Sequence, residues 1–406
     1  MISVAEATRL VFSTVGPLPA ETVALPQAAG RVLREPLHAD RDFPPFDRVA
    51  MDGIALRFAA LEAGQRAFSI ARTQLAGQPP LPLEEPQAAV EIMTGAALPA
   101  GTDTVIRYED LVFTSEAGRR VAAVQVLPPA PGHNVHRRAT DRRQGDLLLP
   151  AGTLLGPAEL GVAATIGAGL VTVARRPRVA VVSTGDELVP IDQTPLPHQI
   201  RRSNGLMLQA AAQQAGAVAE LFHFDDDPAA LRQGLPPLLR EFDAVLLSGG
   251  VSKGQADFLP AALQDAGAEQ LFHEVRQRPG KPFWFGRHPA GAVVFALPGN
   301  PVSTFVNYYR YAAPWLRAVQ QPALPMLPVF HAVLATDVVF RPALTHFLLV
   351  RLVSAPDGRL LAYPLDRTQN SGDLASLLLA DGFVELPAER ETFAVGEAVP
   401  VWRFRY

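Results

Sequence analysis

The residues best suited to chemistry follow four predicted strands between residues 178 and 297. Each segment follows an apolar run, and together they are Thr184-Gly185-Asp186-Glu187, Asp225-Asp226-Asp227, Ser248-Gly249-Gly250-Val251-Ser252 and Pro298-Gly299-Asn300-Pro301. The carboxyl ends of parallel strands meet at one edge of a sheet, where ligands bind. Glycines there admit a ligand to the backbone, and helix N-termini offer N–H groups to anions. We therefore expect a phosphate site, with Mg²⁺ bridging carboxylate and phosphate oxygens.

Each of these features also has a purely structural explanation. A single glycine can serve only a tight turn, and Asp226 or Asp227 before Pro228 can simply cap a helix. Asp186 can cap a short turn in the same way. The convergence of four such loops at one sheet edge favours a ligand site over the separate explanations.

Basic partners for a phosphate come from Arg276, Arg278 and Lys281, which surround Pro279-Gly280 just after another predicted strand. Of the 36 basic residues only Lys253 and Lys281 are lysines, and both lie in glycine-rich turns. One explanation is that the two lysines simply remain by chance in a chain that otherwise uses arginine. Alternatively, these two positions need a compact ammonium group, and we favour this explanation.

A second basic segment contains the pairs Arg137-Arg138 and Arg142-Arg143 on either side of Asp141. By themselves these pairs read as a solvated loop. His133 and His136 have ligand-like spacing, but no further histidine or cysteine accompanies them, so zinc is improbable.

Strands and helices alternate over 176–320 and would position the sheet-edge loops. Ser203-Asn204 offers an N-cap for one helix, Pro228 fits the first turn of the next, and Pro301 opens a third that should be interrupted near Pro314. The alternation predicts a doubly wound parallel α/β domain with helices on both faces of the sheet.

The flanking regions have a different pattern, so the chain is predicted to be multidomain, α/β and β. Short runs broken by Pro, Gly and Asp predict a β-rich insert domain over 42–146. Residues 1–41 and 147–175 form a helical or mixed linking region. Residues 321–406 form a C-terminal β-barrel-like domain, with a turn at Asp357-Gly358.

Composition restricts the class of protein. The net charge of −4 gives no basic excess for nucleic acid, and no apolar run is long enough to span a membrane. The chain contains no cysteine, so disulfides and thiolate metal sites are excluded. No secretory signal is visible, and we expect a cytoplasmic protein.

Six ordered motifs resemble those of the MoeA family, which includes the C-terminal domain of gephyrin. They are FDRVAMDGIA (46–55), IMTGAALPAGTDTVIRYED (92–110), VVSTGDEL (181–188), SGGVSKGQADF (248–258), RPGKPFWFG (278–286) and ALPGNPVSTFVNYYR (296–310). One motif alone is weak, but the ordered set is highly specific and runs over nearly the whole chain. Departures from the family pattern occur at Arg48, Val49, Ile54, Ala139, Thr140, Lys253 and His346.

The resemblance implies a set of functional positions. Those implied in catalysis are Asp52, Thr94, Asp141, Glu187, Asp226, Asp257 and Lys281, with Glu187, Asp226 and Asp257 as the Mg²⁺ ligands. Those implied in substrate binding are Gly185, Asp186, Ser248, Gly249, Gly250, Ser252, Arg278, Pro298, Gly299, Asn300, Pro301, Arg351 and Ser371. Arg351 and Ser371 would come from the second subunit of a homodimer.

The activity implied by the resemblance is the insertion of molybdate into adenylylated molybdopterin, with Mg²⁺-dependent release of AMP. A molybdopterin adenylyltransferase would be the upstream partner. Three alternatives are a divergent MoeA-like paralogue, a pyrophosphatase acting on a related nucleotide, and a binding or scaffold protein. The matched N- and C-terminal regions argue against the pyrophosphatase. No linker or fused domain suggests a scaffold.

Overall fold

A computed structural model describes residues 1–116, 118–251, 258–321, 330–365 and 370–405. The chain divides into two compact units. The first contains Met1–Val23, Ala28–Arg34 and Thr172–Tyr406, and the second contains Ala24–Gln27 and Glu35–Val171. Each unit is described by itself. The proposed four-domain boundaries stay a prediction.

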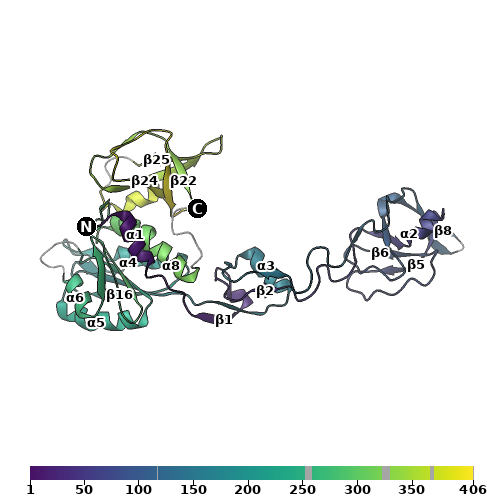
Figure 1. The fold of residues 1–406 in the computed structure, drawn as a ribbon, viewed down its shortest axis with the longest axis horizontal. Helices are drawn as coiled ribbons and strands as arrows, with labels where there is room; N and C mark the ends of the chain where they lie inside the picture. Colours follow the sequence, from purple (N-terminus) through teal and green to yellow (C-terminus); the bar gives the residue numbers. More distant parts are fainter. Residues whose placement is uncertain (117, 252–257, 322–329, 366–369, 406) are drawn as a thin grey trace. The chain divides into compact units, whose positions relative to one another are not determined.

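The first unit is built on a six-stranded sheet in the order β16-β13-β17-β21-β20-β18. Figure 1 labels its edge strand β16. Its strands are β13 (Arg178–Thr184), β16 (Val218–Phe224), β17 (Ala244–Ser248), β18 (Glu269–His273), β20 (Trp284–Arg287) and β21 (Val293–Leu297). The first four in the order are parallel, which confirms the predicted central sheet. Strand β20 pairs antiparallel with β21, and β18 pairs antiparallel with β20. Their short connections contain no crossover helix, and parallel pairing needs one.

Helices cover both faces of this sheet, as predicted. Side chains alternate along β13, so Val179 and Val181 face one helical layer while Ala180 and Val182 face the other. The first layer contains α1 (Val4–Phe12), α4 (Ser203–Gln214), α7 (Pro301–Asn307) and α8 (Ala313–Gln320). The second contains α5 (Pro228–Glu241) and α6 (Leu259–Asp265). The N-terminal helix α1 packs on one face of the sheet, although the sequence pattern groups it with the linking region.

The helix that begins at Pro301 is interrupted before Pro314, as predicted. Between α7 and α8 lies a π-helix, labelled η3 (Tyr308–Ala312). Proline has no N–H to continue the α-helical bonding pattern, which accounts for an irregular turn before it. Single π turns of this kind are frequent at functional positions.

The C-terminal part of the first unit is a closed barrel, which confirms the barrel-like prediction. It consists of β22 (His331–Leu334), β24 (Thr345–Ser354), β25 (Leu360–Pro364), β26 (Gly382–Leu386) and β28 (Ala398–Arg403). Pairing of β24 with β26 closes it. The short strand β19 (Gln277–Arg278) adds to β24 in parallel and ties the sheet domain to the barrel. The predicted turn at Asp357-Gly358 joins β24 and β25, with Gly358 at φ +85°.

Shorter elements complete the first unit. The strands β23 (Val338–Val339) and β27 (Thr392–Phe393) pair with each other, as do β14 (Leu188–Val189) and β15 (Ile200–Arg201). A 3-10 segment, η4 (Leu374–Leu379), follows the Ser371 loop. The strands β1 (Ala20–Ala24) and β12 (Leu170–Ala174) also pair, and each contains a boundary between the two units.

The second unit is β-rich, as expected for 42–146. Its six-stranded sheet has the order β7-β4-β6-β5-β9-β8. The strands are β4 (Gly53–Leu56), β5 (Ala67–Gln74), β6 (Ala89–Ile92), β7 (Thr104–Arg107), β8 (Leu111–Glu116) and β9 (Arg119–Val124). Ile54, Phe68 and Ile106 lie at the centre of its core, against α2 (Phe58–Glu62).

The second unit also contains two short strand pairs and one helix. The strands β3 (Arg48–Val49) and β10 (Val135–His136) pair antiparallel, and so do β2 (Leu37–His38) and β11 (Leu147–Leu149). The helix α3 (Pro157–Thr165) completes it. Among all the described residues, no helix is long and apolar enough to cross a membrane.

Candidate functional site

The strand order reverses between β13 and β17, and two of the predicted loops follow their carboxyl ends. The chain leaves β13 toward β16 on one side and returns to β17 on the other side, so the connections diverge there. Ligands bind at such topological switch points. Gly249 follows β17 with φ +107°, and a Cβ atom on it would lie 2.9 Å from the Thr184 carbonyl oxygen. The predicted glycine at this position is therefore required by both conformation and space.

Asn204 joins two of the predicted loops. Its Nδ2 donates hydrogen bonds of 2.8 Å to Ser248 Oγ and 2.8 Å to the Gly299 carbonyl oxygen. The sequence pattern predicts only a helix cap at Ser203-Asn204, but α4 begins at Ser203 and the Asn204 side chain contacts the predicted loops. The only sequence signal was a polar amide in the first helical turn, which normally reads as a cap.

Two polar atoms at these loops are buried and have no hydrogen-bond partner within the described parts of the chain. They are Thr184 Oγ1 and Asn204 Oδ1. Buried polar groups are nearly always satisfied, so two unpaired groups at the ends of β13 and β17 are suited to a polar ligand.

The acidic residues come from the loops after β13 and β16. Gly185 has φ +138°, and a Cβ atom on it would lie 2.5 Å from Glu187 Oε2, so the Glu187 carboxylate folds back over the glycine. Asp186 Oδ1 accepts a 2.9 Å hydrogen bond from the Asp226 backbone N–H, which joins the two loops. Asp227 caps α5 by accepting from the N–H groups of Ala229 and Ala230.

Two predicted residues of this group, Ser252 and Asp257, lie outside the described residues, as does the neighbouring Lys253. Of the two aspartates between which the sequence left a choice, Asp227 has the capping role. The structure thus places Glu187 and Asp226 in adjoining loops at the predicted sheet edge.

A cavity of about 940 Å³ lies beside this edge, where the barrel meets the sheet domain. The predicted residues that line it are Arg278, Lys281, Pro298, Asn300 and Ser371. Asn300 Nδ2 donates a 3.0 Å hydrogen bond to Ser371 Oγ, and the Val302 N–H donates to the Ser371 carbonyl oxygen at 3.0 Å.

Ser371 thus contacts the sheet edge of its own chain, and the contribution of a second subunit stays a prediction. The loop before η4 is long enough to reach the start of α7, which the sequence pattern alone did not reveal. Arg351 is exposed on β24 opposite Tyr363 and is not among the residues that line this cavity.

His346 lies at the basic end of the cavity. It is paired with Arg278 across β19 and β24, and its ring stacks on Phe340 with centroids 3.9 Å apart. Burial, and then the charge of Arg278, lowers the pKa of His346 to about 4. The imidazole is therefore neutral near pH 7. The Arg278 guanidinium and Lys281 ammonium supply the positive charge, which suits an anionic ligand.

In the second unit, Asp52 and Thr94 contact each other directly. Asp52 Oδ1 accepts from the Thr94 backbone N–H at 2.6 Å and from Thr94 Oγ1 at 2.7 Å. The backbone hydrogen bond and then the side-chain hydrogen bond hold the pKa of Asp52 below its ordinary value. The two residues therefore form a fixed carboxylate–hydroxyl pair.

Asp141 is part of a short chain of hydrogen bonds in the second unit. His136 Nε2 lies 2.9 Å from Asp141 Oδ1, and Arg48 Nη2 lies 3.2 Å from His136 Nδ1. Arginine can only donate, so His136 Nδ1 accepts and Nε2 donates to Asp141. The neighbouring arginines are also paired, Arg137 with Asp47 at 2.7 Å and Arg138 with Asp42 at 2.6 Å.

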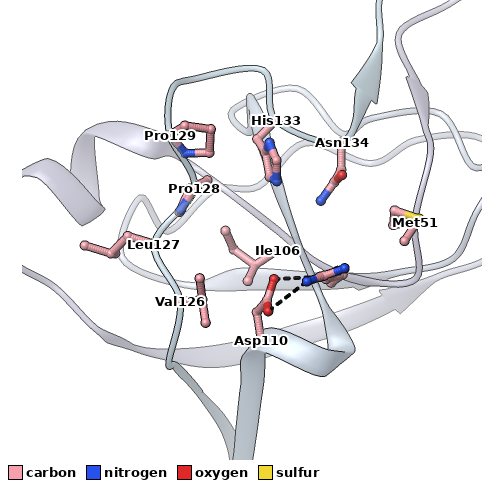
Figure 2. A pocket seen from close by; sticks show the side chains of 10 residues that line it. Met51, Ile106, Asp110, Val126, Leu127, Pro128, Pro129, His133 and Asn134 are labelled. Carbon is pink, nitrogen blue, oxygen red and sulfur yellow. Dashed lines mark hydrogen bonds and ion pairs between the residues drawn. The ribbon is translucent and has the colours of Figure 1, made fainter.

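The second unit also has a pocket of about 300 Å³ that sequence reasoning did not predict (Figure 2). Met51, His133 and Asn134 line it together with the ion pair of Arg107 and Asp110, whose Nε–Oδ2 distance is 2.8 Å. No predicted site residue lines this pocket.

Three family models match the chain in order. The MoeA N-terminal region (domain I and II) matches residues 2–167, a probable molybdopterin binding domain matches 180–318, and the MoeA C-terminal region (domain IV) matches 331–404. Together they cover both units and each of the predicted motifs.

Relatives match from end to end. A molybdopterin molybdenumtransferase from a Synechocystis species is 37% identical over 404 residues, covering 99% of this chain and 100% of the relative. One from Bacillus subtilis is 31% identical over 409 residues, covering 100% and 94%. A crystal structure of the MoeA protein from Pyrococcus horikosii has a TM-score of 0.83 at 30% identity and covers 100% of both chains. By its motifs, its fold and these full-length matches, the chain belongs to the MoeA family.

Proposed function

We propose that this chain is a molybdopterin molybdenumtransferase, which joins molybdate to the dithiolene of adenylylated molybdopterin and releases AMP. The observation that carries the proposal is the cavity bearing Arg278 and Lys281 at the sheet edge. Its volume of about 940 Å³ is within the range of small-molecule sites. Relatives of this name match the full chain.

The chemistry requires cleavage of a phosphoanhydride, with AMP as the leaving group. Such a reaction depends on positioning and on neutralising charge at the transferring oxygens. Lys281 and Arg278 supply cationic groups, while Asn300 and Ser371 supply an amide and a hydroxyl that contact each other at 3.0 Å. The nucleotide part would bind at the loops after β13 and β17, where Gly249 leaves the backbone without a side chain.

Mg²⁺ is part of this proposal. Glu187 and Asp226 would hold it from adjoining loops, since the Asp226 N–H binds Asp186 Oδ1 at 2.9 Å. No group of three possible metal ligands occurs among the residues that the structure describes. Mg²⁺ usually keeps several waters and binds through one or two carboxylates plus substrate phosphates, which fits this donor set. When bound, it would supply charge neutralisation at the pyrophosphate.

The assembly and its surroundings are also proposals. We propose a cytoplasmic homodimer, supplied with substrate by a molybdopterin adenylyltransferase. The consecutive residues Leu378 and Leu379 are 69% and 67% exposed on η4, and adjacent exposed leucines favour a protein contact.

The test is AMP release from adenylylated molybdopterin, measured by chromatography with and without molybdate and Mg²⁺. We expect release that depends on molybdate and is strongly reduced in Lys281→Ala. Release without molybdate would indicate a pyrophosphatase instead. No release and no change in the pterin would indicate a binding or scaffold protein.

A further inference from the structure

We propose that Tyr311, Gln277 and Asn307 are positioning residues for Lys281, because a buried hydrogen-bond network on the π-helix fixes the turn that carries this lysine. The inference rests on the proposed function for the identity of the ligand, and it concerns residues that none of the sequence motifs assigned a role.

Gln277 is the centre of the network. Its side chain is buried, and Nε2 donates to the Gly280 carbonyl oxygen at 3.0 Å and to Asn307 Oδ1 at 2.5 Å. Its Oε1 accepts a 2.6 Å hydrogen bond from Tyr311 Oη. The Tyr311 hydroxyl therefore orients the amide, so that Nε2 is directed at the turn.

Asn307 holds the same turn from helix α7. Its Nδ2 donates a 3.1 Å hydrogen bond to the Gly280 carbonyl oxygen, which thus accepts from two buried amides. Gly280 has φ +83°, and a Cβ atom on it would lie 2.6 Å from the Asn307 amide. The turn consequently packs directly on the helix, with no room for a side chain between them.

The Lys281 backbone is fixed as well. Its carbonyl oxygen accepts from the Val275 N–H at 3.0 Å and the Phe283 N–H at 2.9 Å. The side chain itself is exposed and lines the cavity. A rigid base beneath a solvated ammonium is the arrangement expected where one charge must meet a ligand in a fixed place.

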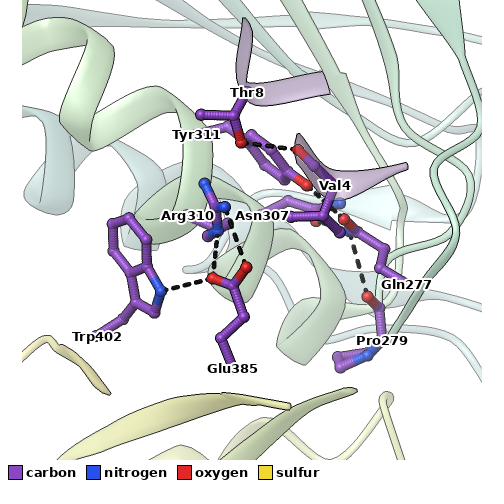
Figure 3. A network of polar contacts seen from close by, with 9 residues as sticks. All are labelled: Val4, Thr8, Gln277, Pro279, Asn307, Arg310, Tyr311, Glu385 and Trp402. Carbon is purple, nitrogen blue, oxygen red and sulfur yellow. Dashed lines mark hydrogen bonds and ion pairs between the residues drawn. The ribbon is translucent and has the colours of Figure 1, made fainter. Parts of the chain in front are cut away.

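The π-helix explains why Tyr311 faces Gln277 (Figure 3). The preceding residue, Arg310, is 2% exposed and binds Glu385 of the barrel at 2.8 Å, with its guanidinium over the Trp402 ring. The wide turn directs Arg310 to the barrel and Tyr311 to Gln277. Barrel and turn are thus fastened to the same five-residue segment, Tyr308–Ala312.

A network of this kind can also serve stability alone, and Tyr308 provides the matched control. It lies on the same π-helix and is 1% exposed, and its Oη has no hydrogen-bond partner among the described residues. Tyr308→Phe and Tyr311→Phe each remove one buried hydroxyl, but only the second removes a bond to Gln277.

The experiment compares both variants in the full-length protein. Binding of inorganic molybdate is measured by calorimetry, KM for molybdate and kcat by AMP release, and stability by urea unfolding. We expect Tyr311→Phe to weaken molybdate binding and raise its KM about tenfold, the usual scale for one lost hydrogen bond. Tyr308→Phe should match the wild type.

A double-mutant cycle with Lys281→Ala separates positioning from a general effect. If Tyr311 acts through Lys281, Tyr311→Phe should have no further effect on molybdate binding once Lys281 is alanine. An undiminished effect in that background, or wild-type binding by Tyr311→Phe, would overturn the inference and leave the proposed function intact. Absence of molybdate binding and of molybdate-dependent AMP release in the wild type would overturn both.

Discussion

Lys281 is the residue that we expect to bind the anionic ligand in the cavity. It is one of two lysines in a chain that otherwise uses arginine, and its backbone is fixed while its side chain is exposed. We expect Lys281→Ala to lower the rate of AMP release or molybdate affinity about ten- to a hundredfold. Its free energy of unfolding should change by within about 0.5 kcal/mol, as for other exposed truncations.

The variant Lys281→Arg serves as the control for charge. If only positive charge matters, arginine should restore activity, since its charge is permanent. If a compact ammonium is needed, Lys281→Arg should resemble Lys281→Ala. Full activity and an unchanged melting temperature in both variants would remove Lys281 from the site.

The Asp52–Thr94 pair gives a prediction about proton binding. Thr94→Val removes the side-chain hydrogen bond and keeps the backbone one, so the pKa of Asp52 should rise part of the way to its ordinary value. Asp52 should then lose its charge at a higher pH than in the wild type. An NMR titration of the Asp52 carboxyl in both proteins measures this, and identical curves would contradict it.

His346 predicts a pH dependence of stability. Its pKa of about 4 in the folded chain lies below the ordinary value of about 6.5 in the unfolded chain, so acid favours unfolding. Stability from this residue is full above about pH 6.5 and falls progressively until about pH 4, by roughly 3 kcal/mol at most. Below about pH 4 both states carry the proton.

The measurement is urea unfolding of wild type and His346→Gln at several pH values in that window. The difference between their free energies of unfolding should change with pH in the direction that favours the variant in acid. A constant difference would show that the imidazole titrates normally in the folded protein.

Gly249 lies where the ends of strands β13 and β17 approach each other too closely for a side chain. Gly249 and Gly291 have the same φ of +107°, but a Cβ atom would lie 2.9 Å from the Thr184 carbonyl oxygen only at Gly249. Alanine at either position should cost about 1–3 kcal/mol of backbone strain. Only Gly249→Ala should also lose binding of AMP, because its methyl group displaces the backbone at Thr184.

Binding of AMP by calorimetry and urea unfolding of both variants check this pair. The open hairpin position of Gly291, with nothing within 4 Å, makes it the matched control for strain. Equal loss of AMP affinity in the two variants would contradict a nucleotide site beside Gly249.

The loops at the sheet edge could be predicted from sequence because their chemistry follows directly from strand order. Short apolar runs that alternate with capped helices indicate parallel strands, so Gly185, Gly249 and Gly299 had to share an edge. The same reasoning predicted the strand before Arg276, which is β18, but not its antiparallel pairing, and it missed β20. Trp284–Arg287 has no alternation that separates it from the preceding turn.

The side-chain hydrogen bonds could not be predicted from the sequence, because they join residues far apart in the chain. Asn204 reads as a helix cap, yet it binds Ser248 and Gly299 at 2.8 Å. Tyr311 reads as a core aromatic, and its bond to Gln277 depends on the π-helix, which adds one residue to the turn and leaves no mark in hydrophobic periodicity.

For the whole molecule, the predicted residues divide between the two units. Lys281, Arg278, Asn300 and Ser371 share one cavity in the first unit, while Asp52, Thr94 and Asp141 belong to the second. The family resemblance implies both groups in the reaction, so replacing a residue of either group should lower activity. Variants of the two groups can therefore test the proposed homodimer.

A mixture of two inactive variants tests the proposed homodimer, and we expect part of the activity to return. Lys281→Ala damages only the first unit's contribution, and Asp52→Asn only the second's. In a symmetric homodimer whose sites each combine residues of both chains, a hybrid dimer contains one fully intact site. Random mixing in equal amounts makes about half the dimers hybrid, so about a quarter of wild-type activity should return after unfolding and refolding together.

Neither variant refolded alone should recover, which controls for the refolding itself. Light scattering at micromolar concentration should give the mass of a dimer, with an interface above roughly 1,000 Å² in total. A dimer without recovery in the mixture would place both contributions in one chain. A monomer would exclude any shared site, because each Lys281→Ala chain would then keep its damaged cavity and each Asp52→Asn chain its altered carboxylate.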